Sequence, residues 1–201
     1  MERENLTVFA AEDVPFYDQI TLSNWSEKGF ISESEAINWH GKACGVVCVQ
    51  MIAEAFQGEK ISLGEIIREA VKNSAYNAGL GWVHQPLAMF ISKRFNLFAT
   101  AHRQVSIDRI KSVLIEGSLV MASVGLRFEG QKNGHLVVVL GCKIESGKVS
   151  GFYVHHPSTD LEFCWIKKYV PIEIFINSFS QNIIEVKRVG IEHKRSALSC
   201  D

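Results

Sequence analysis

The residues best suited to covalent chemistry are two cysteines, Cys44 and Cys48, at the start of an apolar stretch. Cys48 falls on a stripe with the spacing of a buried helix face (Val47, Cys48, Met51, Ile52, Ala55 and Phe56). Cys44 follows the polar, turn-like sequence HGKA, so we expect it at the helix N-terminus. There the helix dipole and unpaired N–H groups would stabilise a thiolate and lower the thiol pKa. Taken alone, Cys44 is more simply explained as a buried structural thiol.

A nucleophilic cysteine needs a base, and His135 is the best placed of the seven histidines. It follows Gly134 and begins the apolar run LVVVL, so we expect its ring at the end of a strand. A histidine in that position also commonly caps the strand or faces solvent. A cysteine at a helix start followed by a histidine in the sheet is, however, the order that papain-like hydrolases use.

A group that orients His135 is expected one hairpin later, in the sequence YVHHPSTD. His156, just before Pro157, could accept a hydrogen bond from the His135 ring, and Asp160 could do so if its loop folds back. His155 and His156 are otherwise ordinary strand-end residues. A histidine pair can bind a metal ion, but no nearby side chain completes a recognisable ligand set, so we predict no metal and no cofactor.

Acyl transfer also needs a donor for the developing oxyanion. The candidates are Gln19 in VPFYDQI and Asn38, six residues before Cys44, although both could be simple loop amides. Gly45 would let the backbone approach a substrate carbonyl.

The elements that must position these residues fall into helices first and strands second. We predict helices at 44–56 (ended by Gly58), from Ser62 with a Ser62–Glu65 capping box, at 81–96 with Pro86 in the first turn, and at 106–117. We predict strands at 118–125, 134–144, 149–157, 160–166 and 182–189, with a short helix at 171–179. Residues 1–42 read as an irregular lead-in. The fold class is therefore α+β, with a mostly antiparallel sheet packed on the Cys44 helix.

The composition of the chain limits its possible binding partners and its cellular location. The chain has 201 residues and a formal net charge of -1, without a basic patch that would call for nucleic acid or an anionic membrane. The sequence has no signal sequence and no apolar run long enough to span a membrane. Its five cysteines do not have the spacing of metal ligands. We therefore expect a cytoplasmic location with reduced thiols. We predict one domain over 1–192 and a polar, flexible tail over 193–201.

A series of segments resembles the peptidase C39-like family, a branch of the papain-like cysteine peptidases. The segments occur in the family's order over roughly residues 13–187: VPFYDQ, INWHGKACG, CGVVCVQMIAEAFQG, GWVHQPLAMFISKRFNLFA, SIDRIKSVLIEGSLVMASV, GHLVVVLGCK, VSGFYVHHPST and PIEIFINSFSQNIIEV. The resemblance implies a papain-like fold, with Cys44 as nucleophile, His135 as general base and Gln19 as oxyanion donor. In related leader-cleaving domains the glutamine stands where this chain has Asn38. The family's Asp or Asn before the strand-end proline is His156 here.

The expected function is hydrolysis of a peptide or amide bond through a thioester acyl-enzyme. One alternative is an acyltransferase that passes an acyl group from a peptide or carrier protein to an amine. A second alternative is a catalytically inactive peptide-binding module, because a neutral His156 cannot stabilise an imidazolium as a carboxylate would. Substrate identity and oligomeric state carry no signal in the sequence.

Overall fold

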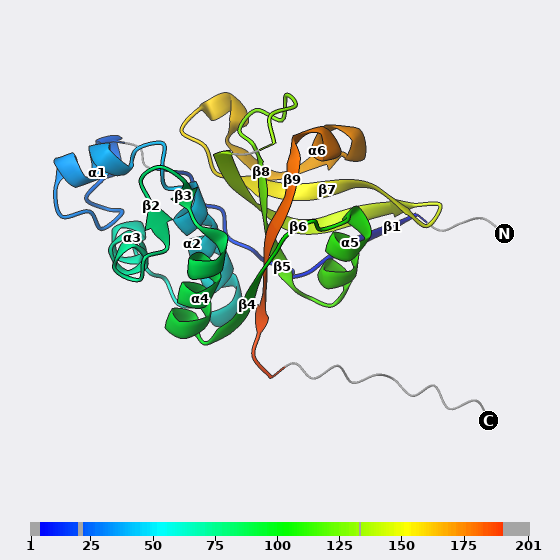
Figure 1. Cartoon of the computed structure of the whole chain (residues 1–201), viewed down its shortest axis with the longest axis horizontal. Helices are drawn as coiled ribbons and strands as arrows, with labels where there is room; N and C mark the ends of the chain where they lie inside the picture. Colours follow the sequence, from blue (N-terminus) through cyan, green and yellow to red (C-terminus); the bar gives the residue numbers. More distant parts are fainter. Residues whose placement is uncertain (1–4, 20–21, 133, 191–201) are drawn as a thin grey trace.

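The computed structural model describes residues 5–19, 22–132 and 134–190 of the chain. In this part of the chain, helices cover both faces of a central antiparallel sheet, which confirms the predicted α+β class. Helices α2, α3 and α4 gather at one end of the sheet, and α5 and α6 lie toward the other (Figure 1). No helix among the described residues is long and apolar enough to cross a membrane.

The helices are α1 (Glu33–Trp39), α2 (Cys44–Gln57), α3 (Leu63–Lys72), α4 (His84–Phe95), α5 (Ile107–Ile115) and α6 (Ile172–Ser178), with short 3-10 turns η1 (Leu22–Asn24) and η2 (Leu161–Phe163). The strands are β1 (Leu6–Phe9), β2 (Tyr76–Asn77), β3 (Gly81–Trp82), β4 (Leu97–His102), β5 (Leu119–Gly125), β6 (Gly134–Glu145), β7 (Lys148–His156), β8 (Trp165–Pro171) and β9 (Phe179–Arg188).

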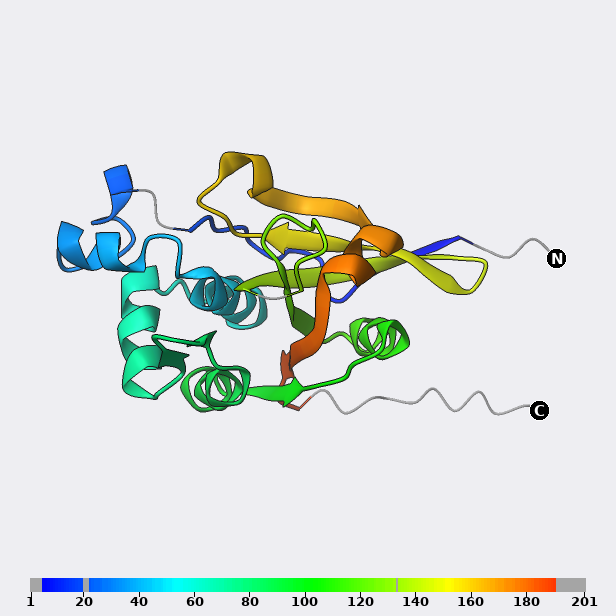
Figure 2. The ribbon, with the colours of Figure 1, turned by 45° about the horizontal axis from the view of Figure 1, so that its top comes forward.

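The main sheet has the strand order β4-β9-β5-β6-β7-β8, and β1 pairs with the far half of β6. In Figures 1 and 2, β1 runs beside the β6–β7 hairpin. Val138 of β6 pairs with His155 of β7, so the end of β7 lies beside the beginning of β6. This register brings the His135 end of β6 and the His156 end of β7 to the same edge of the molecule.

Alternate residues of the central strands enter two different cores. Leu136, Val138 and Leu140 of β6 pack with buried residues of α2 such as Val47, Cys48 and Met51, so the sheet packs on the Cys44 helix as predicted. Val137 and Val139 face the opposite core, with the apolar residues of α5 and α6. Because both faces are covered, β6 needs a continuous apolar run rather than an alternating one. Each such side chain contributes about 1.5–3 kcal/mol of burial.

The first 42 residues contain more regular structure than predicted. β1 and α1 both lie there. Ser32 accepts a hydrogen bond from the Glu35 N–H (3.2 Å), and Glu35 in turn accepts one from the Ile31 N–H (2.8 Å), so side chains cap the start of α1. The box predicted at Ser62 is wrong, because the Gly64 N–H donates to the Lys28 carbonyl oxygen (2.9 Å) and Ser62 makes no side-chain cap.

Two strand predictions also change. The predicted strand at 160–166 is wrong over its first half, which forms η2 with Asp160 as its N-cap, and β8 begins only at Trp165. The edge strand β4 was not predicted, although its six residues pair along β9. The predicted tail at 193–201 lies outside the described residues.

Candidate active site

Cys44 is the first residue of α2 and lines a cavity of about 750 Å³. It is a free thiol with 7% of its surface exposed. Cys48, one turn later, is fully buried, and its thiol donates to the Leu136 carbonyl oxygen (3.4 Å). The two cysteines therefore occupy the positions that the helix pattern predicts, one at the cavity and one in the core.

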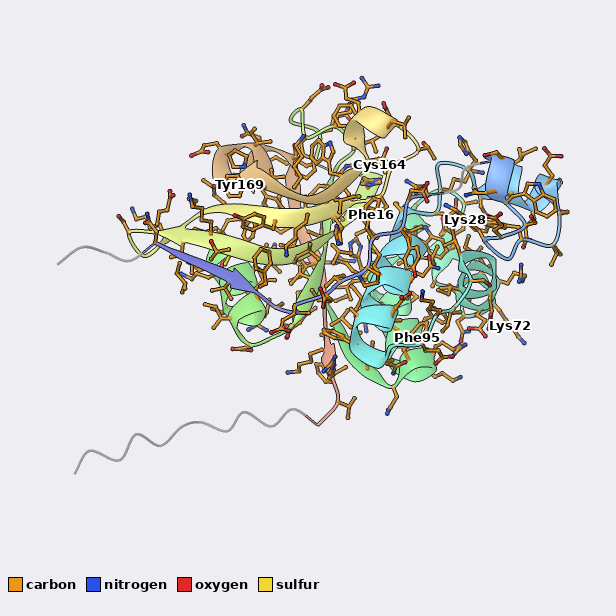
Figure 3. The ribbon with its side chains drawn as sticks, turned by 180° about the vertical axis from the view of Figure 1, so that it is seen from behind. Phe16, Lys28, Lys72, Phe95, Cys164 and Tyr169 are labelled. Carbon is orange, nitrogen blue, oxygen red and sulfur yellow. The ribbon has the colours of Figure 1, made fainter. Side chains whose placement is uncertain are left out.

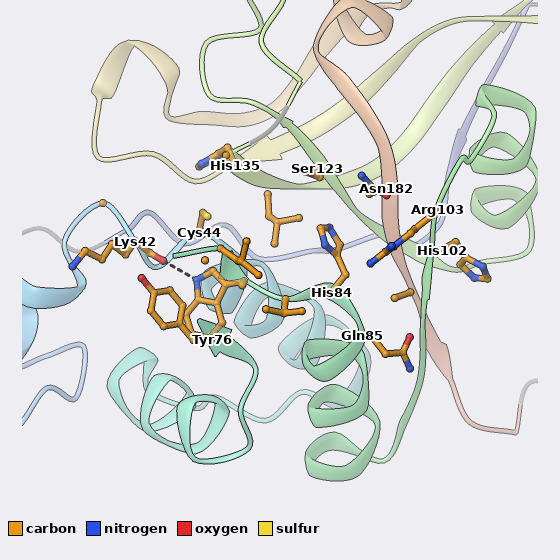
Figure 4. Close-up of a pocket in the computed structure, with 18 residues that line it drawn as sticks. Lys42, Cys44, Tyr76, His84, Gln85, His102, Arg103, Ser123, His135 and Asn182 are labelled. Atoms are coloured by element: carbon orange, nitrogen blue, oxygen red, sulfur yellow. Dashed lines mark hydrogen bonds between the residues drawn. The ribbon is translucent and has the colours of Figure 1, made fainter. Parts of the chain in front are cut away.

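One peptide unit, between Lys42 and Ala43, sets the position of Cys44. Its carbonyl oxygen accepts a hydrogen bond from the Trp82 indole Nε1–H (2.7 Å), and its N–H donates to Gln19 Oε1 (3.1 Å). Figure 4 shows the first of these bonds beside the cavity. Because hydrogen bonds hold both polar groups of this peptide unit, its plane cannot rotate. The position of Cys44 at the start of α2 is therefore fixed.

Gly45 is required for packing at the start of α2. A Cβ atom at this position would lie 2.6 Å from Trp82 Cγ, so the indole occupies the space of the missing side chain. Trp82 belongs to an aromatic cluster with Trp39 and Tyr76, whose ring centroids lie 5.8 and 4.9 Å from its own. Gly45 is thus what allows this cluster to press against the start of α2.

The predicted lowering of the Cys44 thiol pKa is wrong for the free protein. Burial raises the pKa of the thiol above its ordinary value, because a charged thiolate would lose its hydration. The N–H groups of Leu136, Gly45 and Cys44 itself act in the opposite direction, as predicted for a helix start, but burial outweighs them. The unliganded site therefore holds a neutral thiol at neutral pH.

His135 lines the same cavity from the start of β6 and has 4% of its surface exposed (Figure 4). Burial and the neighbouring His156 hold the pKa of His135 well below its usual range, so its ring is neutral. The ring is hydrogen-bonded to the backbone of Pro157, which has no N–H and can only accept.

The protonation pattern of His135 follows from its partners. Nε2 is buried and has no hydrogen-bond partner among the described residues, so the proton donated to the Pro157 carbonyl is on Nδ1. Nε2 then carries a free lone pair. No hydrogen bond joins Cys44 to His135 in the described structure, although the Leu136 N–H next to His135 contacts the Cys44 thiol.

His156 lies beside His135 but does not hydrogen-bond to it. The two rings stack, with centroids 4.4 Å apart and an interplanar angle of 24°. His156 Nε2 donates to the Leu126 carbonyl oxygen (2.9 Å), and its Nδ1 has no partner among the described residues. Phe128 and Trp165 complete an aromatic surround. The expectation that His156 orients His135 through a hydrogen bond is therefore wrong, because the face of the ring, not its edge, meets His135.

Asp160 is also engaged elsewhere. One carboxylate oxygen accepts the Glu162 N–H (3.1 Å) at the start of η2, and the other lies 3.8 Å from Arg127. The described structure gives it no bond to His135. The Pro157 carbonyl takes the place that both side chains were expected to fill.

Of the two oxyanion candidates, only Gln19 is bonded to residues next to the site, Ala43 beside Cys44 and Pro157 beside His156. Gln19 is 3% exposed, and its Nε2 donates to the Pro157 carbonyl oxygen (3.0 Å) while its Oε1 accepts from Ala43. These partners fix the orientation of the amide, since the carbonyl must face its nitrogen and the N–H its oxygen. Asn38 is exposed on α1 and accepts a weak bond from Lys42 (3.5 Å).

The segment that carries Gln19 is tied to the sheet by His155. His155 Nδ1 accepts the Lys167 N–H (3.0 Å), so its Nε2 bears the proton and donates to the Val14 carbonyl oxygen (3.0 Å). The Phe16 ring packs on the His155 ring, with centroids 5.2 Å apart. Figure 3 shows Phe16 where this segment passes between the sheet and α2.

Three parts of the site were missed from the sequence. Trp82 has a signal that was available, since it directly precedes a helix and is one of only four tryptophans. Arg103 follows β4, a strand that was not predicted, and it lines the cavity opposite Cys44. The Pro157 carbonyl has no signal, because every residue carries one. The described residues contain no group of three or more His, Cys, Asp or Glu arranged to hold a metal ion.

No protein-family model and no curated protein sequence matches the chain. The solved structures that share its fold include the following three. A C39-like peptidase from Bacillus anthracis has a TM-score of 0.61 at 16% identity, covering 91% of this chain and 98% of the other. A double glycine motif protease from an AMS/PCAT transporter, in complex with its leader peptide, has a TM-score of 0.56 at 15% identity, with 88% and 92% covered. The peptidase domain of Streptococcus ComA has a TM-score of 0.51 at 12% identity, with 73% and 92% covered.

Proposed function

We propose that this protein is a thiol hydrolase that cleaves a peptide or amide bond, with Cys44 as nucleophile and His135 as general base. The observation that carries the proposal is the state of His135: a buried neutral ring in the cavity of Cys44, with its Nδ1 proton donated to Pro157 and its Nε2 lone pair without a partner among the described residues. The shared fold with peptidase domains, one of them bound to a leader peptide, supports the same class of substrate.

The first step follows from two neutral partners. As the Cys44 sulfur attacks the substrate carbonyl carbon, His135 Nε2 accepts the thiol proton and then passes it to the departing amine. Water then releases the acyl group from the thioester, with His135 again acting as base. The Pro157 carbonyl orients the imidazolium but is not charged, so it stabilises that ion less than a carboxylate would.

Gln19 is proposed to stabilise the oxyanion together with the backbone N–H of Cys44. The Gln19 amide nitrogen has two hydrogens, and one of them donates to Pro157. The second remains for the developing negative charge. The Cys44 N–H, at the start of α2, has no partner within its own helix.

The rate of Cys44 alkylation by iodoacetamide tests this role of His135. Replacing His135 with Gln keeps a polar side chain of similar size but removes the base, and we expect the rate at pH 7 to fall at least about tenfold. Cys164 is also a free and partly exposed thiol, so the assay uses a Cys164→Ser background and follows the Cys44 peptide by mass spectrometry. An unchanged rate in His135→Gln would remove both enzymatic proposals and leave the peptide-binding module.

The acyltransferase alternative differs from the peptidase proposal in the molecule that accepts the acyl group, an amine instead of water. The wild-type protein is incubated with a peptide thioester, with and without added amines, and the products are identified by mass spectrometry. Hydrolysis in excess of transfer supports the peptidase proposal, whereas transfer in excess of hydrolysis supports the alternative. Cys44→Ser is the control for uncatalysed reaction.

A further inference from the structure

The charged side chains that line the cavity of Cys44 are all basic, although the whole chain has a net charge of -1. Its lining contains two side chains that are cationic at neutral pH, Lys42 and Arg103, and no aspartate or glutamate among the described residues. Such a lining attracts anionic groups, and low-dielectric walls strengthen the attraction.

Arg103 lies at the end of the cavity away from Cys44 and points toward His84 (Figure 4). Arg103 is exposed, and no carboxylate in the described part of the chain forms an ion pair with it. Its charge reaches the cavity, since it contributes, after burial, to holding the pKa of His84 below the usual value.

The beginning of α4 adds polar donors at the same place. His84 and Gln85 are its first two residues, and its N-cap Val83 offers no side-chain cap, so their backbone N–H groups are unpaired within the helix. His84 Nε2 is itself buried without a hydrogen-bond partner among the described residues. The Asn182 side chain lies above Arg103 and His84 in the view of Figure 4 and lines the same cavity.

The nearest buried acid does not neutralise this group. Glu185 of β9 is 3.4 Å from His102 Nε2, but its carboxylate already binds Arg109 (2.8 Å) and the Ser118 hydroxyl (3.2 Å). It is not part of the cavity lining. The positive charge of Arg103 is therefore left for a ligand.

We propose that Arg103, His84, Gln85 and Asn182 form a carboxylate-binding subsite (the Arg103 subsite) that selects acidic substrates for reaction at Cys44. The proposal rests on the proposed function, because it concerns the substrate of the same cavity. The carboxylate belongs to a peptide, either as an aspartate or glutamate side chain or as the C-terminal group. Arginine is suited to both, since its guanidinium donates two parallel hydrogen bonds to a carboxylate.

The test uses iodoacetyl peptides that alkylate Cys44. The sulfur displaces iodide from the acetyl methylene carbon, and the thiol proton passes to His135. The probes are iodoacetyl-(Gly)n-Asp-amide, the neutral iodoacetyl-(Gly)n-Asn-amide, and iodoacetyl-(Gly)n-Asn with a free C-terminal carboxylate. The glycine spacer is varied from one to three residues, because the subsite lies across the cavity from the sulfur.

We expect wild-type protein to react about tenfold faster with an acidic probe than with the neutral one at the best spacing. In Arg103→Gln that ratio falls to near one. Lys93→Gln is the matched control, because Lys93 is an exposed cation of α4 outside the cavity, and it keeps the ratio. Preference for the Asp-amide or for the free terminus identifies which carboxylate is bound.

Equal rates for acidic and neutral probes at every spacing would overturn the Arg103 subsite. So would a preference that survives Arg103→Gln. Neither result affects the proposed function, which fails separately if alkylation by the neutral probe does not depend on His135.

Discussion

The rings of His135 and His156 pack face to face, an arrangement that two positively charged rings could not share. Burial lowers the pKa of both, and lowers that of His156 from 6.5 to about 4. A second positive charge 4.4 Å away would be repelled without a carboxylate to compensate it. At this scale His156 acts on His135 as a flat apolar surface and not as a hydrogen-bond acceptor.

The buried His156 makes the fold sensitive to acid. Between pH 6.5 and about 4 the unfolded chain binds a proton at this residue that the native state does not, so the free energy of unfolding falls as the pH falls. The full difference corresponds to roughly 3 kcal/mol. We expect His156→Gln to reduce the pH dependence of the free energy of unfolding by the contribution of about one bound proton. Urea unfolding from pH 7.5 to 4.5 measures this dependence.

An NMR titration of the His156 ring in the wild-type protein serves as a second measurement, in case the variant does not fold. A ring that titrates close to 6.5, or a slope equal in the two proteins, would contradict this account. His135 and His155 also have lowered pKa values caused first by burial, so the wild-type slope is not due to His156 alone.

Among the elements, the beginning of α2 depends on residues that are distant along the chain. Trp82 and Gln19 hold the two sides of the Lys42–Ala43 peptide unit, and Gly45 leaves space for the Trp82 ring. The helix itself was predictable, because its apolar stripe and Gly58 mark it in the sequence. The hydrogen bonds that position its first residue, Cys44, could not be predicted, since neither Trp82 nor Gln19 is near Cys44 in the sequence.

Trp82→Phe tests the peptide unit directly. Phenylalanine keeps most of the aromatic surface but removes the Nε1–H, leaving the Lys42 carbonyl oxygen without that donor. We expect the free energy of unfolding to fall by about 1–3 kcal/mol. The rate of Cys44 alkylation should change as well, because the sulfur is no longer held in place.

The matched control is Trp25→Phe, since the Trp25 indole donates no hydrogen bond to the described residues and packs on the same core. We expect this control to leave the alkylation rate unchanged. If the two variants alter that rate equally, the Trp82 hydrogen bond does not position Cys44.

Sequence patterns predicted the elements best where burial is continuous. β6 and α2 are marked by long apolar runs, whereas β4 is an edge strand of six residues that alternates weakly and was missed. The same Ser-x-x-Glu pattern occurs at Ser32 and Ser62, yet of these two serines only Ser32 caps its helix, because the Gly64 N–H of α3 donates to the Lys28 carbonyl oxygen instead. Tertiary packing decides between such equal local signals.

Across the whole molecule, Gln19 joins three parts of the fold. Its amide connects the lead-in segment, the beginning of α2 through Ala43, and the end of β7 through Pro157. The same Pro157 carbonyl accepts from His135. Cys44 and His135 could be proposed from the sequence because their residue types carry the chemistry, whereas this connection runs through backbone groups that no residue type reveals.

Substitutions at Gln19 separate its two bonds. Gln19→Glu keeps an oxygen for the Ala43 N–H but places a second oxygen against the Pro157 carbonyl, and Gln19→Ala removes both bonds. Because the buried Ala43 N–H loses its acceptor while the Pro157 carbonyl still accepts from His135, we expect Gln19→Ala to lower the free energy of unfolding by about 1–3 kcal/mol. Thermal unfolding and the Cys44 alkylation rate are measured for both variants. A Gln19→Ala protein as stable and as reactive as wild type would contradict this role.

Because a protein is synthesised from its N-terminus, the contacts of Pro157 also determine when the site can be completed. Residues 19 and 44 are synthesised early, but the carbonyl that holds both Gln19 and His135 is added 113 residues after the cysteine. A nascent chain carries the thiol long before it can carry an oriented base. The proposed site can therefore be completed only after β1, β4, β5, β6 and β7 have been made, while β8 and β9 are still to follow.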